Sequence, residues 1–489
     1  MPSTKNLDRL DDALRDNATK YPNQLALWTA RTEFADLANG ISWSQLDRFV
    51  TNLAHQLSQT IGSAQGDKGN RRMVHAVTNS IEDVLVALAC ARAGLVEVPI
   101  DAAGGEAYVR RCREKANGFW IDHDLCCTLI AHATSMQVDS SVERPAIVRP
   151  DPNADALILW TSGSSGDPKG VVLSHKSLYL NAHAKLGAAE QDHSDRRLTV
   201  LSISHAYART CDLGTWLLSA CTLAITRGYD GWLDVAPSFQ PTVANVVPSL
   251  AERLLHNPIG CDALQMLGCG GAALNGALFD AWTDRGVCVI QGYGLTETAP
   301  VISSQTRNDS IVGHAGALVE SWEYRIDASD RLFVRGPCQM KRYLDDPIAT
   351  ASRINADGWL DTGDVVKRCE VTGQLRILGR ADDRLVLTTG HTVDPLNLEK
   401  RVTELSGVKS AVVTAAAGGR KLILWIESDE PDAATMKAQI DAALAGFPTW
   451  ERPSLIRTFT INEAERAIFF NHKGTPRRRR LLAHLGSQQ

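Results

Sequence analysis

The sequence predicts an α/β protein: a large N-terminal domain of layered sheets and helices, followed by a small α+β domain. Between about residues 70 and 340, short apolar runs typical of buried strands alternate with helical stretches, which is typical of helices layered on sheets. Residues 381–489 carry strand and helix patterns of their own. We therefore expect one domain over residues 1–380 and a second over residues 381–489.

The N-terminal helices are predicted by apolar residues at helical spacing. The first is expected over residues 7–21 and the second over residues 43–57. Ser42 precedes the second helix, and a serine there can accept hydrogen bonds from the unpaired N–H groups of the first turn. Residues 84–101 are typical of a packed helix that runs into a strand, with Gly94 where the helix would end.

Several short apolar runs are expected to form buried strands. They are residues 73–77, 157–160, 171–173, 243–247, 287–290 and 421–426. Pro248 closes the fourth run, because proline cannot donate to a sheet. Helices over residues 395–405 and 432–446 are expected to flank the last run in the C-terminal domain.

Composition favours a soluble, cytoplasmic enzyme. The chain has 489 residues, 44% of them hydrophobic, and a formal net charge of −5, so it can bury a core but lacks the basic surface of a nucleic-acid-binding protein. No apolar run is long enough to span a membrane, and the start lacks the apolar core of a signal peptide. The eleven cysteines show no Cys-x-x-Cys pair, which favours reduced thiols.

The most informative segment is Thr-Ser-Gly-Ser-Ser-Gly-Asp-Pro-Lys-Gly at residues 161–170. Glycines let backbone N–H groups turn toward an anion, hydroxyls add neutral donors, and Lys169 adds a positive charge. Such stretches are also typical of flexible linkers, but a position between two apolar strands favours a phosphate-binding loop. The spacing differs from that of the Walker loop. The residues expected to bind phosphate are Thr161, Ser162, Gly163, Ser164, Ser165, Gly166 and Lys169.

A second loop, Gln-Gly-Tyr-Gly-Leu-Thr-Glu-Thr at residues 291–298, follows an expected strand. The Glu297 carboxylate can ligate Mg²⁺, and the Thr296 hydroxyl can donate to a phosphate. A surface turn with a solvated glutamate is the alternative. The small residues at 268–274 permit close approach of a flat ring, although such runs also serve tight packing.

In their order along the chain, these three segments resemble the signature motifs of the adenylate-forming enzymes. This superfamily includes acyl-CoA synthetases, adenylation domains of peptide synthetases and luciferases. Residues 357–364 and 378–383 resemble further motifs, so the resemblance extends from about residue 10 to the C-terminus. It implies that ATP and Mg²⁺ activate a carboxylic acid to an acyl-adenylate, and that a thiol then displaces AMP. It also implies that the C-terminal domain is a mobile lid that turns about Asp382.

The resemblance implies a role for individual residues. Tyr293 would stack on adenine, Thr296 would touch the α-phosphate and Glu297 would hold Mg²⁺. Asp364 would bind the ribose, and Arg380 would lie on the ribose and phosphate side. The other residues expected to contact the nucleotide are Gly270, Gly271, Ala272, Gly292 and Gly294.

Residues 202–210 resemble a segment of long-chain fatty acyl-CoA synthetases, in which His205 would help to orient the substrate carboxylate. Amino-acid-activating relatives carry an aspartate nearby for the substrate amine. Asp212 is the nearest candidate, but its surroundings do not match that motif. We therefore expect a fatty or other hydrophobic acid. Trp216, Leu217, Val246, Val247 and Pro248 are candidates for the pocket wall or for ordinary core.

The C-terminus departs from the family pattern. The position of the family's C-terminal lysine holds Thr475, with Lys473 two residues earlier and Arg477 two residues later. A missing cation would lower the rate of adenylation by ~10²–10³, unless Lys473 or an arginine takes its place. Three functions therefore stay open: an acyl-CoA synthetase, a ligase that loads the phosphopantetheine of an acyl-carrier protein, and an ATP-binding pseudoenzyme.

Overall fold

The computed structural model divides the chain into two compact units. It describes the whole chain except residues 1–6, 30–39, 66–70, 136–146, 148, 163–167, 273, 382–384, 387–391, 394, 417–420, 429–432, 448–450, 471–475 and 487–489. The N-terminal unit comprises Met1–Arg325, Phe333–Thr362 and Arg368–Arg376. The C-terminal unit comprises Ile326–Leu332, Gly363–Lys367 and Ile377–Gln489. The domain boundary expected after residue 380 stays a prediction, because a compact unit is not by itself a part that folds alone.

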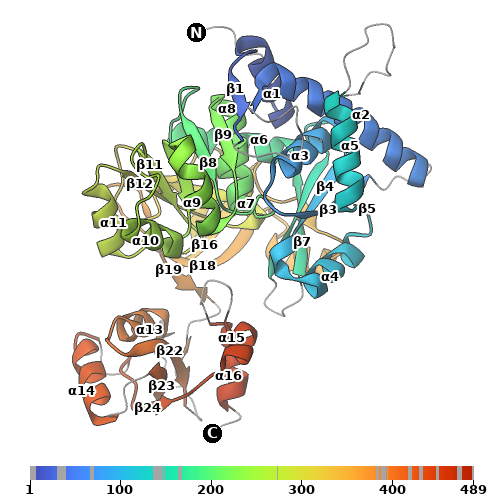
Figure 1. Cartoon of the computed structure of the whole chain (residues 1–489). Coiled ribbons are helices and arrows are strands. Elements are labelled where there is room, and N and C mark those ends of the chain that lie inside the picture. The colour runs from blue at the N-terminus through green and yellow to red at the C-terminus, as the bar shows by residue number, and fades with distance from the viewer. Residues whose placement is uncertain are drawn as a thin grey trace, which may run out of the picture. The chain divides into compact units, whose positions relative to one another are not determined.

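The N-terminal unit contains a nine-stranded sheet of order β14-β13-β12-β11-β10-β8-β9-β1-β2. Its strands are β1 (Leu25–Leu27), β2 (Ile41–Ser42), β8 (Arg196–Thr199), β9 (Thr222–Ile225), β10 (Val243–Val246), β11 (Met266–Cys269), β12 (Cys288–Gly294), β13 (Val301–Ser304) and β14 (Ala317–Leu318). From β12 to β1 neighbouring strands are parallel. Parallel sheets are covered on their faces by helices, and α9 (Gly228–Phe239), α10 (Pro248–His256) and α11 (Gly276–Thr283) lie together along this sheet (Figure 1).

A second sheet of this unit has six strands in the order β17-β7-β6-β4-β3-β5. They are β3 (Arg72–Val77), β4 (Val96–Asp101), β5 (Phe119–Ile121), β6 (Asp155–Ser162), β7 (Pro168–Ser174) and β17 (Arg342–Tyr343). The remaining helices of the unit are α1 (Leu10–Lys20), α2 (Trp43–Gln65), α3 (Ile81–Ala93), α4 (Glu106–Ala116), α5 (His123–Ser135), α6 (His175–Ala188), α7 (Ala206–Ala208), the π-helix η3 (Arg209–Gly214), α8 (Thr215–Ser219) and α12 (Pro347–Arg353). The predicted α/β class is confirmed.

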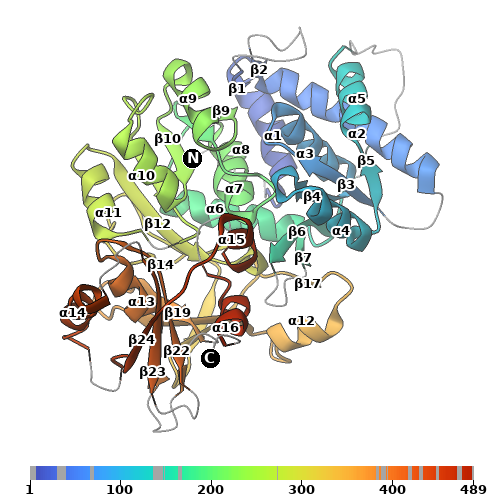
Figure 2. The ribbon, with the colours of Figure 1, turned by 60° about the horizontal axis from the view of Figure 1, so that its bottom comes forward.

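The chain passes between the two units within a four-stranded sheet of order β15-β16-β18-β19. Its strands are β15 (Glu323–Ile326), β16 (Arg331–Arg335), β18 (Leu360–Arg368) and β19 (Leu375–Arg380). In the C-terminal unit, β22 (Val408–Ala415), β23 (Leu422–Ser428) and β24 (Leu455–Thr458) form a three-stranded sheet. Apolar residues of α13 (Pro395–Thr403) and α14 (Ala433–Ala443) pack in one core cluster with this sheet, and those of α15 (Glu463–Phe469) and α16 (Arg478–Gly486) in another (Figure 2). A short hairpin, β20 (Leu385–Val386) with β21 (Thr392–Val393), precedes them.

The expected N-terminal elements are present. The helix predicted over residues 43–57 continues to Gln65, and Ser42 and Gln45 exchange side chain–backbone hydrogen bonds at its start, as expected for a cap. Gly94 has a φ of 66° and ends α3. Trp216, a candidate for the pocket wall, is instead core: it is fully buried and stacks on Trp43 with 5.2 Å between the ring centroids.

The strand predicted over residues 287–290 is longer than expected. It begins at Cys288 and runs through Gly294, so the glycines expected in a turn are part of the strand. The reason is a non-local partner: β13 pairs antiparallel with Gly292, Tyr293 and Gly294. In the part of the chain that the structure describes, no helix is both long and apolar enough to cross a bilayer.

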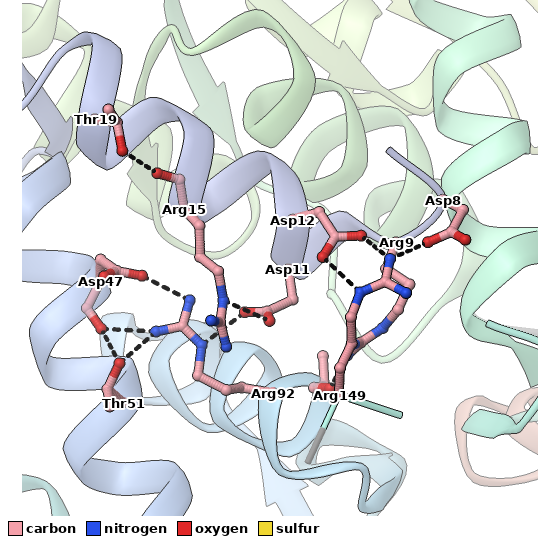
Figure 3. A network of polar contacts seen from close by, with 11 residues as sticks. Asp8, Arg9, Asp11, Asp12, Arg15, Thr19, Asp47, Thr51, Arg92 and Arg149 are labelled. Atoms are coloured by element: carbon pink, nitrogen blue, oxygen red, sulfur yellow. Dashed lines mark hydrogen bonds and ion pairs between the residues drawn. The ribbon is translucent and has the colours of Figure 1, made fainter. Parts of the chain in front are cut away.

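A buried arginine joins three helices of the N-terminal unit (Figure 3). Arg92 of α3 is 1% exposed, and its guanidinium lies 2.8 Å from the Asp11 carboxylate of α1 and 2.7 Å from the Asp47 carboxylate of α2. It also donates to the Thr51 hydroxyl at 2.6 Å. Arg15 contacts the same Asp11 carboxylate from an exposed position. Such a cluster is destabilised strongly when one partner is removed, because the other charge stays buried.

We expect Arg92→Met to lower the free energy of unfolding by about 3 kcal/mol, because Asp11 would lose its buried counter-charge. Urea unfolding followed by circular dichroism measures this loss. The control is Lys20→Ala, which removes an exposed ion pair with Asp16 and should cost less than about 1 kcal/mol. A loss for Arg92→Met no larger than that of the control would contradict the expectation.

Candidate active site

The phosphate-binding segment predicted from the sequence begins and ends in a β-hairpin. Thr161 of β6 pairs with Lys169 of β7, and Ser162 pairs with Pro168. Gly163, Ser164, Ser165 and Gly166 lie outside the described residues. The hairpin therefore fixes the two ends of the loop at neighbouring positions, one strand spacing apart.

Lys169 of this hairpin is connected to Glu297 through Tyr343. Its ammonium lies over the Tyr343 ring, 5.1 Å from the ring centroid, a distance typical of a cation–π contact. The Tyr343 hydroxyl donates to Glu297 Oε1 at 2.6 Å, and Arg353 Nη2 lies 3.9 Å from the same oxygen. Tyr343 is in position because β17 pairs with β7. Burial, and then the Glu297 carboxylate, raise the pKa of Tyr343, so the hydroxyl remains a donor.

Tyr343 and Arg353 were not singled out by the sequence analysis. Tyr343 lies in a strand of only two residues and Arg353 at the end of a short helix, and neither stands in a motif. Both contact a residue about fifty positions earlier in the chain. Only the pairing of β17 with β7, which joins distant segments, could have revealed them.

The donor chemistry at Glu297 suits Mg²⁺. This ion is commonly held by one or two carboxylates, with water and substrate phosphate completing its octahedral shell. Among the described residues, no group of three or more His, Cys, Asp or Glu side chains could form a complete metal cage. Glu297 follows β12 directly, in a turn of 3₁₀-helix with Thr296. A single carboxylate beside the hairpin that is expected to bind phosphate therefore fits the ion.

The glycine-rich segments after β11 and within β12 approach other parts of the chain closely. A Cβ at Gly294 would lie 1.7 Å from the Pro300 carbonyl oxygen, so only glycine fits there. A Cβ at Gly270 would lie 2.9 Å from the Tyr207 ring. Gly271, Ala272, Gly292 and Gly294 are exposed and Tyr293 is half-buried, so these residues are accessible to a ligand.

His205 is held by a carboxylate. Its Nε2 lies 3.3 Å from Asp101 Oδ2 at the end of β4, and His205 is itself exposed. Asp101 also accepts from Arg227 at 2.6 Å and from the Ala103 backbone at 2.9 Å. Burial would raise the pKa of Asp101, but the hydrogen bonds from His205 and Arg227 outweigh it and hold this pKa below its usual range. Residues 84–101 were expected only to pack, but they also supply Asp101, the partner of His205.

Asp364 and Arg380 lie in the C-terminal unit, where they form an ion pair. Arg380 Nη1 donates to Asp364 Oδ1 at 3.0 Å, and Asp364 is buried. The structure therefore brings these two predicted residues together. Asp382, Lys473 and Thr475 lie outside the described residues.

Comparison with known proteins identifies the family. The model of a family described as AMP-binding enzyme matches residues 14–344. A feruloyl-CoA synthase of Amycolatopsis sp. is 24% identical over 440 residues, covering 83% of this chain and 88% of the relative. A long-chain-fatty-acid–CoA ligase of Salmonella typhimurium is 29% identical over 315 residues, covering 59% of this chain and 56% of the relative.

Solved structures share the fold over nearly the whole chain. ATP-bound MatB from Rhodopseudomonas palustris matches with a TM-score of 0.77 and 22% identity, covering 97% of this chain and 98% of MatB. O-succinylbenzoate coenzyme A synthetase (MenE) from Bacillus subtilis, in complex with AMP, matches with a TM-score of 0.76 and 20% identity, covering 96% and 97%. The predicted class of acid–thiol ligase is confirmed by the curated relatives. Because the family model spans well over half of the sequence, this chain belongs to the AMP-binding enzyme family.

Proposed function

We propose that this protein activates a carboxylic acid with ATP and transfers the acyl group to coenzyme A. The observation that carries the proposal is the chain of contacts from the β6–β7 hairpin through Lys169 and Tyr343 to Glu297. It joins an ammonium group and a carboxylate that suits Mg²⁺ to the hairpin that flanks the segment expected to bind phosphate. The names of the curated relatives, which are CoA synthases and ligases, support the thiol acceptor.

The proposed reaction has two steps, adenylation of the acid and transfer of the acyl group to the thiol. An oxygen of the substrate carboxylate attacks the α-phosphorus of ATP, and pyrophosphate leaves. The thiol sulfur of coenzyme A then attacks the acyl carbon, AMP leaves, and the thiol gives up its proton. Mg²⁺, when bound, neutralises phosphate charge. Lys169 and Thr296 would position the phosphates, and Glu297 would hold the ion, so catalysis rests on positioning and charge neutralisation.

The finer expectation of a fatty or other hydrophobic acid stays a prediction. The long-chain-fatty-acid–CoA ligase of Salmonella typhimurium supports it. The feruloyl-CoA synthase and a 2-succinylbenzoate–CoA ligase of Listeria monocytogenes show that relatives at similar identity are named for other acids. Loading of a carrier protein and a pseudoenzyme without efficient chemistry stay as alternatives, the second because of Thr475.

An ATP–pyrophosphate exchange assay with panels of fatty, aryl and amino acids tests the proposal. We expect exchange with at least one fatty or aryl acid and none with α-amino acids. Coenzyme A and a phosphopantetheinylated carrier protein are then offered separately, and the thioester is identified by mass spectrometry. Clear ATP binding without exchange by any acid would favour the pseudoenzyme, and acylation of the carrier protein alone would favour the second alternative.

We expect Tyr343→Phe to raise the Mg²⁺ concentration that supports half-maximal exchange by about 10-fold. Loss of the hydroxyl removes the hydrogen bond that orients Glu297, and such partners of a metal ligand typically change metal affinity by about 10–100-fold. Exchange measured against Mg²⁺ concentration gives the shift. Tyr324→Phe, at an exposed tyrosine of β15, is the matched control; equal curves for both variants would exclude this role of Tyr343.

Lys473→Ala should slow adenylation by ~10²–10³ if Lys473 supplies the cation missing at Thr475. Exchange rates at saturating ATP measure the effect, and Arg477→Ala is the matched variant on the other side of Thr475. An exchange rate that Lys473→Ala leaves unchanged would reject the substitution, and a loss only in Arg477→Ala would assign the role to the arginine.

A further inference from the structure

A buried lysine of the N-terminal unit has no counter-charge within the described part of the chain. Lys185 on α6 is 7% exposed, and its ammonium donates to the Ser304 hydroxyl at 2.7 Å. Among the described residues, no carboxylate forms an ion pair with it. Burial lowers the pKa of Lys185; the Cys211 thiol opposes this shift, and the nearby Arg197 guanidinium adds to it. A charge buried without a partner costs several kcal/mol of stability, and such groups are frequent at ligand sites.

The nearest charged pair cannot supply the missing anion. Arg197 of β8 and Asp212 of η3 are both buried and lie 2.5 Å apart. Asn245 also donates to Asp212, at 2.6 Å. Burial raises the pKa of Asp212 to about 6 despite the Arg197 guanidinium, and the contacts with Arg197 and Asn245 already engage its carboxylate. Lys185 and Arg197 therefore bring two positive charges to this region, and among the described residues the Asp212 carboxylate pairs with Arg197 alone.

Lys185 lies close to the Gly292–Tyr293 motif of the candidate site. Its partner Ser304 lies opposite Gly292 in the pairing of β13 with β12, and a Cβ at Gly292 would lie 4.0 Å from the Ser304 hydroxyl. Only one hydroxyl group therefore separates the ammonium from the exposed backbone of the Gly292–Tyr293 motif. The Tyr207 hydroxyl lies against Gly270 and donates to the side-chain Oδ1 of Asn245 at 3.4 Å. Asn245 is the residue that also donates to Asp212.

The surroundings of Lys185 are otherwise apolar. Ala184, the residue before it, belongs to a small core cluster with Cys211 and Val301. The other members or neighbours of this cluster are Val319, Ala188, Tyr207 and Trp322. A ligand that reaches Lys185 would thus pass apolar side chains and end at a single positive charge and a hydroxyl.

We propose that Lys185 binds a second acidic group at the far end of the substrate, so that the acid has an apolar body and two carboxylates. This inference rests on the proposed function, since the first carboxylate is the one that ATP activates. The second carboxylate would take the Ser304-bound ammonium of Lys185 as its counter-charge. A charged hydrogen bond in an apolar environment is strong and selective.

The test compares pairs of acids of equal length in the exchange assay: hexanoate with adipate, and octanoate with suberate. We expect kcat/KM to be at least about 10-fold higher for the dicarboxylate in the preferred pair. Lys185→Met should lower the ratio of the two kcat/KM values at least about 10-fold, mainly through KM of the dicarboxylate, and Lys185→Arg should retain part of it. Lys176→Met, at an exposed lysine of the same helix, should leave the ratio unchanged.

Calorimetric titration of suberate and octanoate into wild type and Lys185→Met, with AMP present, gives a second readout. If no acid supports exchange, the proposed function fails, while loss of suberate binding in Lys185→Met would still support the inference. A wild type that prefers the monocarboxylate, or a ratio that Lys185→Met leaves unchanged, would overturn it. Lys185→Met should unfold at no lower urea concentration than wild type, because it removes an unpaired buried charge; a clear loss of stability would indicate a purely structural role.

Discussion

The need to pair buried charges is the constraint on which the N-terminal unit depends. Arg92 holds α1 and α2 on α3 through two carboxylates. Glu97 of β4 is fully buried, yet Arg209 of η3 lies 2.5 Å from it and His75 of β3 at 3.1 Å. Burial would raise the pKa of Glu97, but Arg209 and His75 keep it below its usual value. These pairs join segments far apart in sequence, because an unpaired partner would be costly.

The candidate site follows from strand pairing across the two sheets. Tyr343 belongs to the six-stranded sheet through β17, whereas Glu297 follows β12 of the nine-stranded sheet. Their hydrogen bond therefore joins the two sheets at the point where the β6–β7 hairpin carries Lys169. The Met340 backbone also donates to the Glu297 carbonyl at 2.7 Å, which fixes the main chain on both sides. The site is positioned by backbone ladders, and side-chain contacts of Tyr343 with Lys169 and Glu297 complete it.

The sequence predicted what depends on local chemistry. Gly94 ends a helix and Ser42 caps one because the requirement lies within one turn of chain. Gly292 and Gly294 were expected in a turn but belong to β12, because their strand partner β13 is non-local. Tyr343, Asp101 and Lys185 were missed because their partners lie 46, 104 and 119 positions away. No periodicity reveals a pair at such separations; only the sheet order does.

The same charge constraint bears on the class of substrate. Asp212, the nearest candidate for binding a substrate amine, is already held by Arg197 and Asn245. An ammonium group would have to displace a buried guanidinium from it, which leaves that guanidinium unpaired and costs several kcal/mol. A negatively charged group would instead be favoured beside Lys185, whose hydrogen-bond partner among the described residues is a neutral hydroxyl. An anionic group there would relieve an existing imbalance, so the fold disfavours an amine at this position and favours a carboxylate.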